Sequence, residues 1–217
     1  MSENYSSIAF TRHVRDAQER YGSRAAVERL GPEVPGSPGG AEPRDPLTDF
    51  EAEFIGLRDG FYLASTSDTG WPYVQFRGGP PGFVKVLDEH TFGWADFRGN
   101  RQYISAGNIA GDDRVSVFFM DYPRQLRLKV FGRATVVDAR DDPSVVRALT
   151  VADYRAKVER AVTVTVVAFD WNCQQHITAR YSAEELREVL APMQEELARL
   201  RAQVRGGAAA AGEVLSP

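Results

Sequence analysis

The amino-acid sequence predicts a mainly β fold of the α+β class, a single antiparallel barrel of about six strands flanked by short helices. Residues 60–140 contain short aromatic and β-branched runs, and turn residues separate these runs at regular spacing. Small helical segments lie between some of the strands. Closing the sheet into a barrel would remove the edges that so many short strands otherwise leave unpaired.

The chain begins with segments that are predicted to be helical and irregular. Residues 11–30 are polar and helical in character, with Thr11 as the N-cap. Proline, glycine and charged residues dominate the next stretch, GPEVPGSPGGAEPRDP, which is typical of a linker. A short helix is expected in LTDFEAEFIGLRD at 47–59. We therefore expect an N-terminal helical extension and linker over residues 1–48.

The barrel domain is expected over residues 49–182. Its predicted strands lie at 61–66, 71–77, 83–87, 91–96, 114–122, 126–139 and 160–172. Short helices are predicted in QYISAGNIAGDD at 102–113 and in PSVVRALTVADYRAKVE at 143–159. Residues 183–217 are expected to form a C-terminal helix and tail, with the helix either exposed or packed against a partner.

Composition excludes several classes of protein. The 217 residues are 43% hydrophobic and 26% charged, with a net charge of −4 and a pI of about 5.5, which disfavours binding to nucleic acid or anionic membranes. No apolar run approaches the roughly 18 to 20 residues of a membrane span, and no secretory signal is visible. Cys173 is the single cysteine, so no internal disulfide can form. We expect a soluble, cytoplasmic protein.

A first pair of cations lies on two neighbouring predicted strands. Arg77 ends one strand and Lys85 lies inside the next, and the connection GGPPG lets a backbone approach a ligand closely. Because Lys85 has apolar neighbours on both sides, its amino group must either extend to solvent or meet an anionic partner. A solvated lysine on an edge strand is the alternative interpretation.

A second cationic segment reads Arg98-Gly99-Asn100-Arg101, directly before a predicted helix. Backbone N–H groups at a helix start, together with two guanidinium groups, can bind a phosphate. An ordinary solvated turn has the same composition. The phosphate site is favoured because Arg77 and Lys85 would bring the number of neighbouring cations to four with no counter-ion.

Two further segments contain polar residues with possible functions. Gln125, Arg127 and Lys129 alternate with Leu126, Leu128 and Val130, the pattern of a half-buried strand, and the Gln125 amide can act as hydrogen-bond donor and acceptor at once. DWNCQQHITARY at 170–181 is a dense polar and aromatic cluster, although Trp171 is equally compatible with a core position. One cysteine and three scattered histidines give no metal-ligand set, and no third group supports a Cys–His nucleophile pair.

Taken together, these segments resemble the pyridoxamine 5′-phosphate oxidase-like flavin-binding family. The resemblance rests on FYLASTSDTGWPYVQFRGGPPGFVKV, TFGWADFRGNRQYISAGNI and DDRVSVFFMDYPRQLRLKVFGRATVVD, in that order. DWNCQQHITARY resembles the C-terminal block of a subgroup described as flavin-nucleotide-binding. The resemblance implies a split β-barrel that forms a homodimer, with two FMN sites at the subunit interface.

The resemblance also implies roles for individual residues. The FMN phosphate would be held by Arg77, Lys85, Arg98, Asn100 and Arg101. Gln125 would face the flavin from the other subunit. The ring would lie near Val74, Gln75, Phe76, Trp171 and Arg180.

The chain departs from true pyridoxamine phosphate oxidases in two places. It lacks their terminal Arg-Leu-His-Asp-Arg stretch, and Gly99-Asn100-Arg101 replaces a frequent Ser-Arg-Lys. We therefore expect an FMN-dependent oxidoreductase acting on an unidentified small organic substrate, with His176 as the candidate proton donor. The alternatives are a non-catalytic flavin carrier or redox sensor, and a member of the same fold that binds FAD, a deazaflavin or haem.

Overall fold

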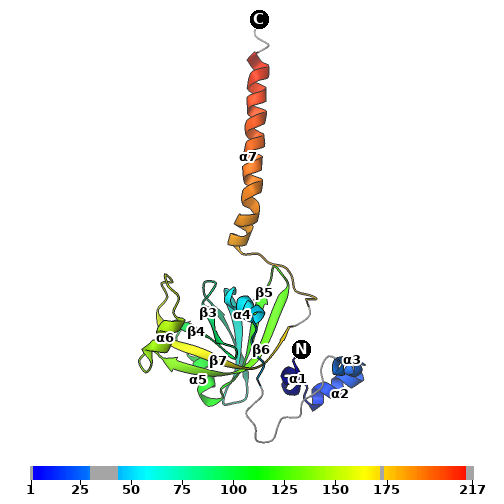
Figure 1. Cartoon of the computed structure of the whole chain (residues 1–217), viewed down its shortest axis with the longest axis vertical. Helices are drawn as coiled ribbons and strands as arrows, with labels where there is room; N and C mark the ends of the chain where they lie inside the picture. The colour runs from blue at the N-terminus through cyan, green and yellow to red at the C-terminus, as the bar shows by residue number, and fades with distance from the viewer. Residues whose placement is uncertain (1, 30–43, 172–173, 214–217) are drawn as a thin grey trace. The chain divides into compact units, whose positions relative to one another are not determined.

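The structure, a computed structural model, describes residues 2–29, 44–171 and 174–213. The chain divides into two compact units: residues 1–121 with 125–176, and residues 122–124 with 177–217. The first unit contains every strand and the helices α1 to α6, and the second contains the long helix α7 (Figure 1). In the part of the chain described, no helix combines the length and the apolarity needed to cross a membrane.

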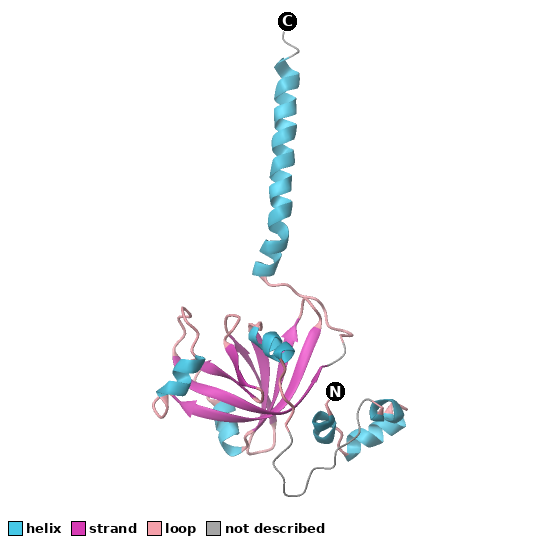
Figure 2. Cartoon of the chain, viewed as in Figure 1, coloured by secondary structure: helices cyan, strands magenta, loops and turns pink. Residues whose placement is uncertain are grey.

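The first unit is built on one seven-stranded antiparallel sheet (Figure 2). Its strands, in the order β2-β1-β5-β6-β7-β4-β3, all pair with antiparallel neighbours. This arrangement confirms the predicted mainly β fold with flanking helices. The strands are β1 Gly60–Thr66, β2 Pro72–Gly78, β3 Val84–Asp88, β4 Thr91–Phe97, β5 Arg114–Asp121, β6 Leu126–Asp138 and β7 Val158–Trp171.

Aromatic side chains fill the interior of the barrel and join strands that are distant in the sheet order. Phe61 of β1 lies 4.8 Å from Trp94 of β4 and 5.2 Å from Phe119 of β5, measured between ring centroids. Phe83, just before β3, stacks on Phe61 at 5.8 Å. All four rings are fully buried. Because these contacts connect both ends of the sheet, burial of aromatic surface holds the barrel closed.

The two long strands β6 and β7 lie in the middle of the sheet order, and their pairing is irregular at one point. Their register shifts between Phe131 and Gly132. A Cβ at Gly132 would lie 2.7 Å from the carbonyl oxygen of Thr165 and 2.5 Å from a methyl group of Val164. Only glycine allows this close approach, so Gly132 permits the bulge.

Seven helices lie in the described residues: α1 Glu3–Ala9, α2 Arg12–Arg20, α3 Arg24–Glu28, α4 Asp49–Gly56, α5 Ile104–Gly111, α6 Pro143–Leu149 and α7 Ala183–Glu213. Gly22, with φ of 73°, divides the helix predicted over 11–30 into α2 and α3. Helix α1 has no counterpart in the predictions, and the helix predicted over 143–159 ends at Leu149, the last residue of α6. A helix of seven residues has little stability of its own, and Tyr5 ties it to the barrel by stacking on Phe131 at 4.9 Å.

Helix α4 begins with a capping box that also fixes it to the end of β7. The Glu51 carboxylate accepts hydrogen bonds from the backbone N–H and the hydroxyl of Thr48. Its other oxygen accepts a hydrogen bond from Trp171 Nε1 at 2.7 Å. Burial by itself raises the pKa of Glu51, but the hydrogen bonds from Thr48 and Trp171 outweigh it and the pKa lies below its usual value.

Candidate functional site

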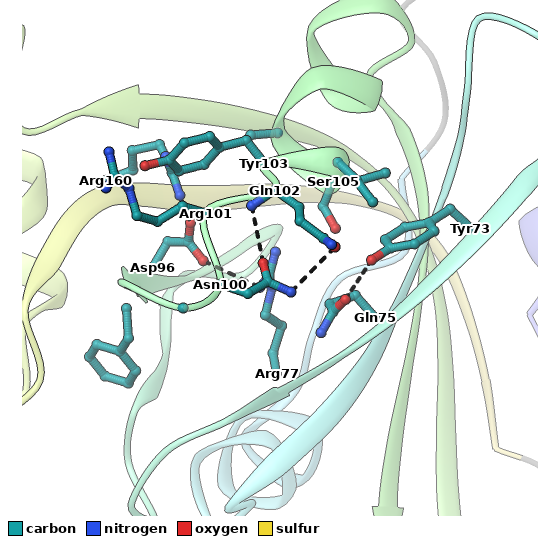
Figure 3. Close-up of a pocket in the computed structure, with 14 residues that line it drawn as sticks. Tyr73, Gln75, Arg77, Asp96, Asn100, Arg101, Gln102, Tyr103, Ser105 and Arg160 are labelled. Carbon is teal, nitrogen blue, oxygen red and sulfur yellow. Dashed lines mark hydrogen bonds and ion pairs between the residues drawn. The ribbon is translucent and has the colours of Figure 1, made fainter.

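A cavity of about 110 Å³ opens where β2, the end of β4, the start of β7 and the start of α5 meet (Figure 3). This volume exceeds the roughly 30 Å³ that one water occupies in the liquid. The cavity is lined by Tyr73, Gln75, Arg77, Asp96, Phe97, Gly99, Asn100, Arg101, Gln102, Tyr103, Ile104, Ser105, Ala106 and Arg160. It therefore brings residues 99–101 of the second cationic segment, the start of a helix and one face of β2 into a single site.

Strand β2 contributes three side chains because neighbouring positions on a strand point to opposite faces. Tyr73, Gln75 and Arg77 are half-buried and line the cavity, whereas Val74 and Phe76 between them are exposed. The Tyr73 hydroxyl donates a hydrogen bond to Gln75 Oε1 at 2.6 Å. One face of β2 thus presents an amide and a guanidinium group to the cavity.

The loop between β4 and α5 adopts an unusual backbone conformation. Arg101 and Tyr103 have φ of 64° and 56°, in the left-handed region that costs non-glycine residues about 1 to 2 kcal/mol each. The Asn100 side chain stabilises the turn, because its Oδ1 accepts the Gln102 backbone N–H at 3.1 Å and its Nδ2 donates to Gln102 Oε1 at 3.3 Å. The loop brings Ile104 and Ser105, the first residues of α5, to the cavity wall.

The charges around the cavity are unbalanced. Arg160 donates to Asp96 Oδ2 through Nη2 at 2.5 Å and Nε at 3.1 Å, and Arg77 Nη1 lies 3.8 Å from the other Asp96 oxygen. Burial by itself lowers the pKa of Arg160, but the hydrogen bonds and charge of Asp96 raise it above its usual value. With Arg101, the lining carries three arginines and one aspartate, so the cavity attracts anions.

Arg101 is held near the cavity although it is exposed. Its interaction with the Tyr103 side chain is the main cause that raises the pKa of Arg101. The Tyr103 hydroxyl in turn donates to Glu159 Oε2 at 3.3 Å, and the Arg160 guanidinium carbon lies 4.7 Å from the centre of the Tyr103 ring. Tyr103 therefore orders two of the three arginines.

Two polar atoms at the cavity have unused hydrogen-bonding capacity. Arg77 Nε and Ser105 Oγ are buried and have no hydrogen-bond partner among the residues that the structure describes. Ser105 as a whole is only 4% exposed. Buried polar atoms in native proteins are nearly always satisfied, so two unsatisfied donors beside one positively charged cavity indicate a site for an acceptor.

The comparisons with known proteins identify the family of this chain. A family model described as pyridoxamine 5′-phosphate oxidase matches residues 47–172, more than half of the sequence. The chain belongs to the pyridoxamine 5′-phosphate oxidase family. The residues matched include every strand and every residue that lines the cavity. The sequence resemblance is thereby confirmed at the level of the family.

The solved structures that are similar to the chain are distant in sequence, and no curated protein matches the chain. HupZ from Group A Streptococcus is 16% identical with a TM-score of 0.47, over 62% of this chain and 100% of that chain. A putative pyridoxamine 5′-phosphate oxidase from Lactobacillus delbrueckii is 21% identical with a TM-score of 0.45, over 58% and 94%. An F420 reductase is 18% identical with a TM-score of 0.39, over 54% and 93%. Likenesses this distant carry no information on substrate or cofactor.

Within this family fold, the cavity contains four of the residues expected at the flavin site, namely Gln75, Arg77, Asn100 and Arg101. Lys85 does not line it, because Lys85 Nζ donates to the backbone carbonyls of Ala148 at 2.7 Å and Thr150 at 3.1 Å. These carbonyls close the last turn of α6, where a cation is stabilising. The amino group thus has backbone acceptors in place of the anionic ligand that we expected.

Arg98 also lies outside the cavity lining. Its Nε is 3.4 Å from Glu159 Oε1, and its backbone N–H donates to the Lys157 carbonyl at 2.8 Å. Arg98 therefore has a counter-ion in the subunit itself, contrary to the expectation that the neighbouring cations would lack one.

The two hydrophobic residues predicted to line the ring lie on the other face of β2. Phe76 packs over two glycines, since a Cβ at Gly60 would lie 2.4 Å from its ring and one at Gly78 would lie 2.8 Å from it. Val74 is 60% exposed. A cavity-side ligand could meet these two residues only through their backbone, because the pleat directs their side chains away.

Gln125 and Trp171 occupy positions that differ from those expected. Gln125 belongs to the turn between β5 and β6, with φ of 56°, and the predicted half-buried strand begins only at Leu126. The left-handed conformation ends the alternation there. Trp171 packs on Phe54 at 4.6 Å and donates to Glu51, so it has the core role that its sequence context allowed.

His176 and Arg180 follow the end of β7. His176 is exposed, with φ of 64°. The Arg180 guanidinium group lies over the Tyr122 ring at 5.2 Å, within the second unit. Cys173 lies outside the described residues, and no cluster of metal-ligating side chains occurs among the residues that are described.

Several cavity residues were not predicted from the sequence. Asp96 and Arg160 are 64 positions apart and meet only through the pairing of β4 with β7. Tyr73 lies four residues before Arg77, so the period of two along a strand would have placed it on the same face. Ser105 is the second residue of α5, a position at which the backbone N–H group is available to an anion.

Proposed function

We propose that the cavity binds the phosphate group of FMN and that the chain is an FMN-dependent oxidoreductase acting on a small organic molecule. Membership of the pyridoxamine 5′-phosphate oxidase family supports this proposal. The observation that carries it is the pair of unsatisfied buried donors, Arg77 Nε and Ser105 Oγ, beside a cavity with an excess of positive charge. A solvated turn would not account for buried donors without acceptors.

The residues at the cavity fit a phosphate in their chemistry. Arg77 and Arg101 offer guanidinium groups, and charge-assisted hydrogen bonds are roughly twice as strong as neutral ones. The first N–H groups of α5 and the Ser105 hydroxyl add neutral donors at the positive end of a helix dipole. The Asn100 side chain holds the loop in the conformation that presents these groups.

A bound flavin would supply the electron-transfer chemistry, and the protein would position it. We propose that Gln75 orients the part of the nucleotide nearest the phosphate, since its amide lines the same cavity. Contacts from Gln125, Trp171 and Arg180 to the ring, and proton donation by His176, belong to the same proposal. Among these groups, the His176 imidazole is of the side-chain type that most often serves as a general acid or base.

We further propose that the protein is a homodimer whose copies meet at the outer face of β1 and β2. Tyr62 is 38% exposed and Phe76 54% exposed, and their rings pack against each other at 5.5 Å. Val74 extends the same exposed apolar surface along β2, and the exposed Trp71 lies just before that strand. An exposed apolar patch of this kind is typical of a protein interface.

The proposal is tested by titrating the protein, freed of any bound cofactor, with FMN and with riboflavin. Riboflavin lacks the phosphate, so a phosphate site predicts that FMN binds at least about tenfold more tightly. The absorption spectrum of the freshly purified protein shows whether an oxidised flavin co-purifies. Equal affinity for the two ligands would contradict the phosphate site, and failure to bind either would favour a deazaflavin, haem or another ligand.

Reduction of the bound flavin separates an enzyme from a carrier. Anaerobic mixing with NADH or NADPH should bleach the flavin absorption, and re-oxidation by an organic acceptor should restore it. A protein that binds FMN tightly but is reduced by neither donor would favour the carrier or redox-sensor alternative. FAD is compared in the same titration. Its second phosphate and its adenosine would have to extend beyond the cavity, so the comparison shows whether the protein prefers FMN or FAD.

A further inference from the structure

Helix α7, Ala183–Glu213, carries a regular row of exposed apolar side chains along its described part. The row consists of Leu186, Leu190, Met193, Leu197, Leu200 and Val204. The intervals between these residues are four, three, four, three and four positions, which is the heptad pattern of a coiled-coil seam. Written as heptads, Leu190, Leu197 and Val204 are a positions, and Leu186, Met193 and Leu200 are d positions.

These side chains have no cover among the described residues. Their exposed fractions run from 42% at Leu190 to 72% at Val204. Apolar surface is stabilised by about 25 cal/mol per Å² when it is removed from water, so a continuous row of six such residues favours association. Figure 1 shows α7 as one continuous helix, and the row spans about 27 Å of it at 1.5 Å per residue.

We propose that α7 pairs in parallel with α7 of a second copy of the chain, forming a two-stranded coiled coil. This inference concerns a segment outside the family match, which ends at residue 172, and goes beyond nucleotide binding. In a parallel pair, identical residues meet in each layer of the seam, so Leu190 packs on Leu190 of the other copy and Leu200 on Leu200. The coil would join two copies at a surface distinct from β1 and β2.

Charge complementarity favours the second copy and the parallel orientation. The g position Glu196 lies five residues before the e position Arg201, and a parallel pair places these opposite charges on neighbouring helices twice. An antiparallel pair would instead bring e positions together and place Arg187 near Arg201 of the other copy. Such exposed pairs stabilise a helix pair only weakly, so the apolar seam drives association and the charges select orientation.

Pro192 is compatible with this coil. It lies inside α7 at a c position, on the side of the helix away from the seam. A proline in a helix interior removes one backbone hydrogen bond and destabilises the helix. A solitary helix with such an interruption is marginal in water, whereas packing of an apolar face against a partner helix offsets the loss.

Disulfide trapping in the full-length protein tests the proposal. Cys173 is replaced by serine to remove the single natural thiol, and Leu200→Cys then places one thiol in the seam. Because a disulfide needs Cβ atoms about 3.5 to 4.5 Å apart, a parallel coil should give cross-linked dimers under mild oxidation. The matched control, Arg199→Cys, places the thiol one residue away on the outer face and should remain largely reduced.

The outcomes separate the possible occupants of the apolar row. Dimers from Leu200→Cys with few from Arg199→Cys support the parallel coil. A Leu200→Cys protein that stays reduced, or equal cross-linking at both positions, would overturn it. If the Leu200→Cys protein stays reduced, the two helices would pair antiparallel, or the apolar row would pack against another surface. FMN binding of the same variants is measured separately, so failure of the coil is distinguishable from failure of the flavin site.

A second measurement uses variants of the seam itself. Leu190→Lys with Leu197→Lys should reduce the helical circular-dichroism signal and abolish the seam disulfide when combined with Leu200→Cys. Glu195→Lys, at an outward f position, is the control and should change neither. Undiminished cross-linking in the double lysine variant would also overturn the coil, because two charged layers cannot be buried without partners.

Discussion

Asp96 and Arg160 form an ion pair across β4 and β7, and that pair is part of the cavity wall. The two residues face each other in the strand register, and Arg160 Nη2 lies 2.5 Å from Asp96 Oδ2. Asp96 is nearly fully buried, and it also lies 3.8 Å from Arg77. One carboxylate therefore neutralises part of the charge of two arginines and leaves the remainder for a ligand.

Replacing Asp96 by asparagine should destabilise the fold. The change keeps the side-chain shape but leaves the Arg160 charge without its counter-ion in a site where the Arg160 side chain is only 16% exposed. We expect the free energy of unfolding to fall by about 3 kcal/mol, measured by urea denaturation near neutral pH. Asp112→Asn removes the partner of Arg114 from a solvated pair and should have little effect. If both variants lost the same free energy of unfolding, the buried Asp96–Arg160 pair would contribute no more to stability than the solvated Asp112–Arg114 pair.

Arg101→Ala and Lys85→Ala should have different consequences. Arg101 lines the cavity, so its loss should weaken FMN binding by about tenfold or more with little change in stability. Lys85 donates to the carbonyls of Ala148 and Thr150, so its loss should lower the free energy of unfolding by about 1 to 2 kcal/mol. Fluorescence titration with FMN and thermal unfolding separate the two effects. A large loss of FMN affinity in Lys85→Ala would contradict this prediction and show that Lys85 contributes to phosphate binding.

Ser105→Ala should weaken ligand binding without destabilising the ligand-free protein. Its buried hydroxyl has no partner among the described residues, so removing it relieves an unsatisfied group. We expect an unchanged or slightly higher Tm without ligand and about threefold to tenfold weaker FMN binding. A fall in Tm with unchanged FMN affinity would contradict the assignment.

Ser65→Ala is the matched control for that experiment. Ser65 is as buried as Ser105, at 4% exposure, but its hydroxyl accepts a hydrogen bond from Asn108 Nδ2 at 3.0 Å. Removing it leaves the buried amide without that acceptor, so Ser65→Ala should lower the free energy of unfolding by about 1 to 3 kcal/mol. The contrast between two equally buried serines separates the loss of a bond from the relief of an unsatisfied group.

Glu51 should contribute a stability that depends on pH. Its pKa in the folded protein is below its usual value of 4.5, because hydrogen bonds from Thr48 and Trp171 favour the charged form more than burial disfavours it. A lowered pKa stabilises the fold at pH values above 4.5, and that stability is lost as the pH falls toward the folded-state pKa. Denaturation midpoints measured between about pH 5 and 3 should therefore fall more steeply in the wild type than in Glu51→Gln.

Glu53→Gln is the control for the pH series, since Glu53 lies on the same helix with an exposed side chain. This variant should follow the wild-type curve. Parallel curves for the wild type and Glu51→Gln would show that the Glu51 carboxylate does not titrate differently in the folded and unfolded states.

Local sequence patterns predicted the parts of the site that lie close together along the chain. The period of two in β2 identifies which side chains share a face with Arg77, and the glycine and asparagine after β4 indicate a turn before α5. Asn100 and Arg101 therefore reach the same cavity wall as the start of α5. These relationships depend on backbone geometry over a few residues, which residue type largely decides.

Other features depend on contacts between distant segments. The sequence by itself determined the mainly β fold, the approximate positions of its strands and the family, because periodicity and turn residues act locally and the motifs occur in order. The tertiary structure alone decided that Arg160 faces Asp96, that Lys85 reaches the end of α6 and that the Ser105 hydroxyl lacks a partner. Strand register and barrel closure are set by burial of the aromatic core, and local pattern cannot specify which distant residues that burial brings together.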